Sequence, residues 1–83
     1  MKAELQFITK EQCGLCDEAL AKIRPLARWT GVSLIVRDVA AMSDAGIAAR
    51  VPVLMAKQTE LHAGPMAWPD AIRVILRARF TRS

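Results

Sequence analysis

Two cysteines, Cys13 and Cys16, stand in the stretch TKEQCGLCDEA at residues 9–19, and the chain has no others. Thiols at this spacing can cycle between dithiol and disulfide, supply half of a zinc site, or hold copper(I) between two thiolates. A closed zinc site takes four ligands, and the single histidine, His62, leaves an ordinary site incomplete. The spacing alone therefore leaves redox exchange and copper(I) binding open.

A structural crosslink is a weak explanation for the pair. A disulfide between Cys13 and Cys16 would close a four-residue loop and stabilise the chain by only about 2 kcal/mol. The N-terminal sequence MKAELQFITK breaks its apolar residues with charges and so lacks the core of a secretory signal. We therefore expect a cytoplasmic location, where thiols are kept reduced.

Composition predicts one domain spanning residues 1–83. A hydrophobic content of 53% suits a globular core, and no apolar run is long enough to span a bilayer. The net charge is +4, and the arginines near the C-terminus are interpreted as complements to a helix dipole. We expect a monomer with no nucleic-acid partner and no membrane partner.

Hydrophobic periodicity sets out the elements that must position the cysteines. Alternating or β-branched runs predict strands, and apolar residues at helical spacing predict helices. The predicted strands are residues 3–9, 32–39, 51–56 and 60–63, and the predicted helices are residues 13–30, a short one at 44–50 capped by Ser43, and a last one from 69 to 80. The order is β-α-β-(α)-β-β-α, an α/β fold of the thioredoxin-like type, with a four-stranded mixed sheet flanked by helices.

This order places the cysteine pair at the start of the first helix. Free backbone N–H groups and the helix dipole favour a thiolate at Cys13, and Cys16 lies one turn further in, close enough for a disulfide. Cys13 is therefore predicted to attack a substrate disulfide, and Cys16 to resolve the mixed disulfide that results. His62 is interpreted as an edge-strand residue, and Trp29 and Trp68 as packing residues at helix ends.

At this point the chain resembles the glutaredoxins, in particular the small glutaredoxin-like domains of bacteria that carry C-x-x-C-D-E-A. Four features carry the resemblance over nearly the whole length. They are Cys13-Gly14-Leu15-Cys16 after the first strand, Asp17-Glu18-Ala19 directly behind it, Val51-Pro52-Val53 at the third strand, and Gly64 at the end of the fourth. The resemblance implies a glutaredoxin-like thiol–disulfide oxidoreductase.

The resemblance also implies further site residues. Pro52 would be a cis-proline facing the cysteines, with Val51 ready to pair with a substrate chain, and Gly64 would belong to the same site. Lys10 matches a glutathione-contacting lysine, and Arg50 stands where the family has a threonine and could contact an anionic group. Gly14 and Leu15 replace the usual proline and tyrosine between the cysteines, and Gly64-Pro65 replaces a glycine pair.

We expect no tightly bound cofactor and protein or glutathione disulfides as partners, and the resemblance makes glutathione one candidate co-substrate. Three alternatives stay open beside this function. The cysteines could bind copper(I), they could hold an iron–sulfur cluster bridged between two chains with the help of glutathione, or the chain could be a non-catalytic interaction domain.

Overall fold

The computed structural model describes residues 3–41, 51–57 and 59–80. The elements follow in the order β1 (Glu4–Thr9), α1 (Gly14–Thr30), β2 (Ser33–Asp38), the 3-10 helix η1 (Val39–Ala41), β3 (Val53–Ala56), β4 (Thr59–Ala63) and α3 (Trp68–Phe80). The strands form one sheet in the order β2-β1-β3-β4, in which β1 pairs parallel with β2 and antiparallel with β3, and β3 pairs antiparallel with β4. The predicted mixed four-stranded sheet is confirmed.

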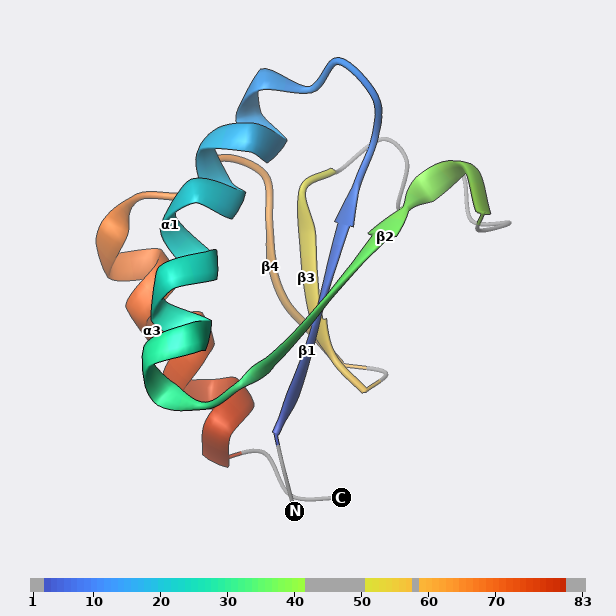
Figure 1. Ribbon diagram of the computed structural model, residues 1–83. Coiled ribbons are helices and arrows are strands. Elements are labelled where there is room, and N and C mark those ends of the chain that lie inside the picture. The colour runs from blue at the N-terminus through green and yellow to red at the C-terminus, as the bar shows by residue number, and fades with distance from the viewer. Residues whose placement is uncertain (1–2, 42–50, 58, 81–83) are drawn as a thin grey trace.

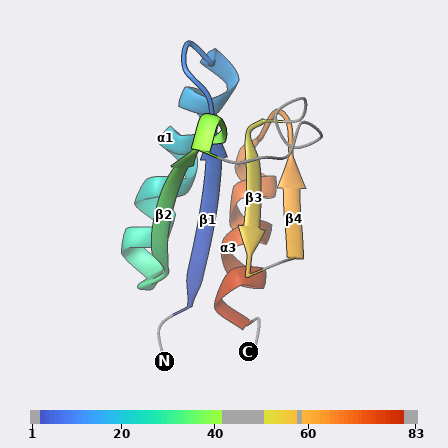
Figure 2. The ribbon, with the colours of Figure 1, turned by 90° about the vertical axis from the view of Figure 1, so that its right-hand side faces the viewer.

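Helices α1 and α3 lie side by side on one face of the sheet (Figures 1 and 2). Strand β1 is central, and successive side chains along it point to opposite faces. Leu5 and Phe7 therefore turn toward the helices while Ile8 turns to the other face, and all three are fully buried. Burial on both faces explains why this strand is almost continuously apolar, as the sequence predicts.

The core has two parts, one on each face of the sheet. The part under the helices consists of Leu5, Phe7, Cys13, Cys16, Ala19, Ile23, Ala27, Val32, Leu54, Met66, Ala71, Val74, Ile75 and Ala78. The part on the other face is Ile8 and Val53, with Val39, Val51, Met55 and Ala63 packed against them. Both cysteines thus belong to the core that fixes the helices on the sheet.

Helix α1 ends where the sequence predicts. Gly31 takes the left-handed conformation with φ 79°, which L side chains rarely adopt, and Val32 N–H donates to Ala27 O at 2.9 Å. This is the hydrogen-bonding pattern of a glycine-terminated helix. Pro25 lies inside α1 on its exposed side, and the helix continues past it to Thr30.

Several element limits differ from the prediction. β3 begins at Val53 rather than at residue 51, because Pro52 has no N–H to give to the ladder. Val39 belongs to η1 rather than to the second strand. The predicted short helix at 44–50, its cap Ser43 and the candidate site residue Arg50 lie outside the described residues.

The interpretation of the tryptophans as packing residues is wrong. Trp29 is 86% exposed and Trp68 is 51% exposed. The core face of α3 is made by Ala71, Val74, Ile75 and Ala78, and its two small alanines allow a close approach to the sheet and to α1. Ile72, Leu76 and Phe80 of the same helix are exposed.

Candidate active site

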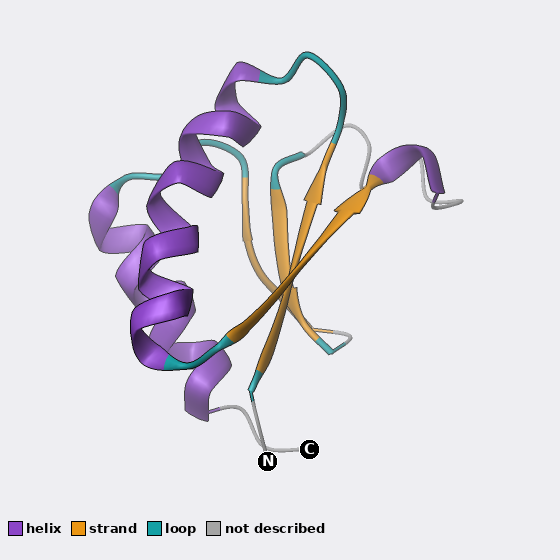
Figure 3. Cartoon of the chain, viewed as in Figure 1, coloured by secondary structure: helices purple, strands orange, loops and turns teal. Residues whose placement is uncertain are grey.

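The candidate site lies where β1 passes into α1. β1 ends at Thr9, and the connecting loop turns the chain back over the sheet to start α1 at Gly14 (Figure 3). Gln12 makes the reversal with a positive φ of 53°, a conformation found mainly in turns. The loop therefore delivers Cys13 to the first turn of the helix, as the sequence predicts.

Cys13 is the N-cap of α1. Its backbone is extended, with φ −111° and ψ 101°, and its Sγ accepts a hydrogen bond from Cys16 N at 3.1 Å. Its carbonyl oxygen accepts from Asp17 N at 3.0 Å, which is the first bond of the helix. The sulfur thus takes the place of the Ser or Asp oxygen that satisfies a free N–H at most helix starts. In the reduced protein the same N–H would favour a negative charge on this sulfur.

Cys13 and Cys16 are joined in a disulfide, and their Cα atoms lie 5.2 Å apart. That separation lies within the range in which a bridge forms without movement of the backbone. Cys13 is 8% exposed and Cys16 is 1% exposed, while Gly14 and Leu15 between them are exposed. An incoming sulfur can therefore reach Cys13 more directly than Cys16.

Pro52 lies at the same end of the sheet as the cysteine loop. The pairing of Ile8 with Val53 sets Pro52 just beyond the end of that ladder, next to the end of β1. The Val51–Pro52 peptide bond is cis, and Pro52 is buried. Val51 is partly buried and packs against the core that contains both cysteines.

Gly64 is hydrogen-bonded to the backbone of Pro52. Its N–H donates to Pro52 O at 2.8 Å, and its φ of 87° turns the chain out of β4. A side chain at this position would strain the turn, which explains on structural grounds why a glycine stands here. The structure thus brings together two of the sequence-predicted residues, one just before β3 and one just after β4.

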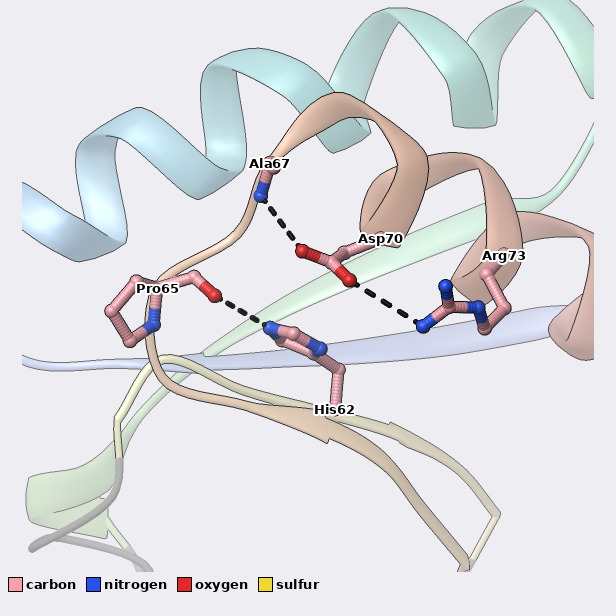
Figure 4. Close-up of polar contacts among 5 residues, drawn as sticks. All are labelled: His62, Pro65, Ala67, Asp70 and Arg73. Carbon is pink, nitrogen blue, oxygen red and sulfur yellow. Dashed lines mark hydrogen bonds and ion pairs between the residues drawn. The ribbon is translucent and has the colours of Figure 1, made fainter.

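The segment after Gly64 is held by polar contacts that sequence reasoning missed. His62 Nε2 donates to Pro65 O at 2.9 Å, and Asp70 accepts from Ala67 N at 3.0 Å while facing Arg73 at 3.4 Å (Figure 4). His62 lies on edge strand β4 as predicted. The position of Asp70, three residues after Ala67, is a helix-start signal that could have revealed the second contact.

Two further residues complete the surroundings of the cysteines. Met66, which the sequence did not single out, is buried in the same core cluster as Cys13 and Cys16. Lys10 is exposed in the loop three residues before Cys13, and the acids Glu11 and Asp17, which are near it in sequence, are exposed as well. The local charge around the cysteines is therefore mixed.

The described ranges, 3–41, 51–57 and 59–80, contain no cluster of three or more His, Cys, Asp or Glu side chains that could hold a metal ion. Within the same ranges, no helix is both long and apolar enough to cross a membrane. The structure thus has a capped cysteine pair and a buried cis-proline at the same end of the sheet, and the cysteine pair is chemically suited to disulfide exchange.

Comparisons with known proteins identify the family and the fold of the chain. The family profile described as "Glutaredoxin-like domain (DUF836)" matches residues 4–79. Thioredoxin 1 from the thermophilic eubacterium Thermosipho africanus TCF52B is 20% identical with a TM-score of 0.63, covering 89% of this chain and 91% of its own. A structure described as a malarial protein is 13% identical with a TM-score of 0.61, covering 98% of this chain and 100% of its own. No curated protein sequence matches significantly. At these identities the structural likeness shows the fold alone, and it confirms the thioredoxin-like prediction.

Proposed function

The chain belongs to the glutaredoxin-like domain family, and from that premise we propose that it is a thiol–disulfide oxidoreductase. One observation carries the proposal: Cys13 caps α1 through its sulfur and is bridged to the more deeply buried Cys16. In the proposed cycle Cys13 is the nucleophile and Cys16 is the resolving thiol.

The first step is attack by Cys13. In the reduced protein its thiolate forms a bond to one sulfur of the substrate disulfide, and the other substrate sulfur leaves as a thiolate that takes up a proton. The N–H of Cys16, which lies 3.1 Å from the Cys13 sulfur, supports this step because it favours the charged form of the attacking group.

The second step releases the substrate. The Cys16 thiolate attacks Cys13 Sγ in the mixed disulfide, the second substrate thiol leaves, and the Cys13–Cys16 disulfide forms. Across the two steps the substrate gains two electrons and the protein loses two. Two molecules of a thiol such as glutathione can return the dithiol by the same exchange in reverse, with one glutathione disulfide as product. A reducing compartment suits this cycle, so the proposal includes a cytoplasmic location.

Substrate contacts in the proposal come from both sides of the pair. Gly14 and Leu15 are exposed between the cysteines, and Val51 stands directly before Pro52, where the preference of such a residue for an extended backbone would let it pair with a substrate chain. Gly64 supports Pro52, and Lys10 supplies a cation for an anionic substrate such as glutathione. Arg50 is proposed, on the basis of the sequence alone, to contact an anionic group of the substrate.

The test compares Cys13→Ser and Cys16→Ser in two assays, reduction of a peptide disulfide and reduction of a glutathione mixed disulfide. Loss of both activities in Cys13→Ser is expected. Activity on the glutathione mixed disulfide that persists in Cys16→Ser would support a glutathione-linked route, because that route needs one thiol only. Activity lost in both variants would point to dithiol exchange with protein disulfides.

The same preparation tests the alternatives. Wild-type protein without activity in either assay, but with copper(I) held at a ratio of one ion per cysteine pair, would overturn the oxidoreductase proposal in favour of a copper(I)-binding module. A brown protein that is dimeric and needs glutathione for its colour would indicate a bridged iron–sulfur cluster. Absence of redox activity, copper binding and colour would favour a non-catalytic interaction domain.

A further inference from the structure

Large apolar side chains remain in solvent along the parts of α1 and α3 that follow their first turns. Phe80 is 72% exposed, Trp29 is more exposed still, and about half of Ile72 and Leu76 is exposed. We call the outward side of residues 19–30 and 71–80 the distal helix surface. The arrangement needs an explanation, because exposed side chains of this size usually mark a contact surface when they are contiguous.

The apolar side chains form a row. Ile72, Leu76 and Phe80 follow one another at four-residue spacing on α3, so they lie on neighbouring turns of the same side. Arg73 and Arg77 directly follow Ile72 and Leu76, which sets a basic row beside the apolar one. Helix α3 therefore has three zones around its axis: a core row, an exposed apolar row and a basic row.

The end of α3 is joined to the end of α1. Arg79 Nη1 donates to Thr30 O at 2.9 Å, which ties the last turn of α3 to the end of α1 (Figure 1). Seven residues make nearly two full turns, so Ile72 shares the α1-facing side of α3 with Arg79. Trp29 precedes Thr30 and so adds a further exposed apolar side chain at the end of α1, next to this junction of the two helices.

The charge of the distal helix surface has a single sign. Residues 19–30 and 71–80 contain six basic residues, Lys22, Arg24, Arg28, Arg73, Arg77 and Arg79, and no acidic ones. The acids of the two helices stand near their starts: Asp17 and Glu18 beside the cysteines, and Asp70, which faces Arg73, in the first turn of α3. A helix dipole explains cations in a last turn, but it explains neither Arg24 in the middle of α1 nor the exposed aromatic rings.

We propose that the distal helix surface binds the surface of membranes that contain anionic lipids. Arginines can contact the phosphate groups while tryptophan, phenylalanine and aliphatic side chains enter the boundary between headgroups and acyl chains. The proposal needs no spanning segment, and the expectation of no membrane partner rested on the lack of such a segment. It is also independent of the proposed redox function.

Other partners fit the same surface less well. A second copy of this chain would set arginines against arginines, which is unfavourable. A nucleic acid is bound by basic groups at its phosphates and by aromatic rings that stack on its bases. Neither contact would use the exposed aliphatic side chains of Ile72 and Leu76. A bilayer, by contrast, accepts apolar side chains from a convex helix surface without a matching shape.

Such binding would leave the cysteines accessible. Cys13 caps the start of α1, whereas Trp29 lies at its end, and a helix of 17 residues is about 25 Å long. The redox pair would therefore stand away from the membrane while the distal helix surface touches it.

The test measures binding of the full chain to vesicles of phosphatidylcholine mixed with phosphatidylglycerol, and to vesicles of phosphatidylcholine alone, by cosedimentation. The two tryptophans, Trp29 and Trp68, supply a second readout, because their emission shifts to the blue when they leave water. Saturable binding to the anionic vesicles with a blue shift, weakened at high salt, is expected.

Variants at exposed positions separate the contributions. Ile72→Gln/Leu76→Gln should weaken binding about tenfold or more, and Arg24→Gln/Arg28→Gln about thirtyfold. The matched controls are Ile35→Gln/Val36→Gln, which removes exposed apolar side chains from β2, and Arg37→Gln/Lys57→Asn, which removes two exposed charges elsewhere. The controls should bind like the wild type.

Three results would overturn the inference. One is an absence of vesicle binding at low salt. A second is binding that Ile72→Gln/Leu76→Gln leaves unchanged, since it would then be a general effect of positive charge. The third is a preference, under the same conditions, for single-stranded RNA, an acidic peptide or self-association that depends on the same arginines.

Discussion

Cys13 has a structural role as well as a chemical one, and the two can be separated by comparing Cys13→Ser with Cys13→Ala. Its sulfur accepts the Cys16 N–H at 3.1 Å and so caps α1. Serine is a strong N-cap residue and alanine is not; at ordinary N-caps the exchange costs about 1 kcal/mol. Neither variant can form the disulfide, so the loop-closure contribution of about 2 kcal/mol is absent from both and cancels in the comparison.

The expected difference follows from that cap. Cys13→Ala should unfold about 4–8 °C below Cys13→Ser, the shift that about 1 kcal/mol gives in a domain of this size. Thermal unfolding followed by circular dichroism measures it, with both proteins kept under reductant so that Cys16 stays free. Disulfide-exchange activity should be lost in both variants, because neither has the nucleophile.

Two results would refute this reasoning. Equal stability of the two variants would show that a side-chain acceptor at position 13 does not stabilise the start of α1, which would contradict the capping role given to Cys13. Exchange activity that survives in either variant would show that Cys13 is not the attacking group. Cys16→Ala is a suitable control, because it removes the disulfide and leaves the Cys13 cap in place.

Three further predictions test other parts of the structure. Gly14→Pro should stabilise the protein by about 0.5–1 kcal/mol, because proline suits the first position of a helix and a Cβ at Gly14 meets nothing within 4 Å. Gly31→Ala has the same open space but a φ of 79°, so this variant should be destabilised by about 1 kcal/mol. Thermal unfolding measures both changes. Asp70→Ala removes the acceptor for Ala67 N and should cost about 1 kcal/mol in a denaturant titration; an unchanged midpoint would contradict the role of that bond. In the reduced protein the pKa of Cys13 should lie below that of free cysteine, so the alkylation rate plotted against pH should have its midpoint below about 8.5, and a midpoint at or above that value would reject the effect of the helix start.

The elements around the cysteines could be predicted from the sequence because their signals are local. The alternation in β1 and the helical spacing that begins at Cys16 are strong, and Gly31 marks the end of α1. From these alone the cysteine pair falls at a strand-to-helix junction. The position of Cys13 as N-cap follows from the same pattern, and the structure adds the hydrogen bond that gives it a physical effect.

The orientation of α3 could not be predicted in the same way. The periodicity gives two neighbouring rows, one with Val74 and Ile75 and one with Ile72 and Leu76, and size alone favours the second as core. In the folded chain the row with Val74 and Ile75 is buried, because it also carries the small residues Ala71 and Ala78, which allow close packing against α1. That choice depends on contacts between distant parts of the chain.

The contacts around Gly64 could not be predicted from the sequence either. The bond from Gly64 N to Pro52 O joins residues on either side of the β3–β4 hairpin, and it depends on the turn made at a φ of 87°. A motif can indicate that Pro52 and Gly64 share a site, but only the folded chain shows that they are hydrogen-bonded to each other.

The central claim is that Cys13 is the attacking thiol and Cys16 the resolving one. The most direct measurement is trapping of the mixed disulfide: reduced Cys16→Ser and reduced Cys13→Ser are each mixed with an excess of a disulfide substrate, and the products are followed by intact-mass spectrometry over time. The account predicts rapid accumulation of one substrate-sized adduct on Cys13 in Cys16→Ser and little adduct in Cys13→Ser, because Cys16 is buried more deeply. Faster adduct formation on Cys16 than on Cys13 would contradict it.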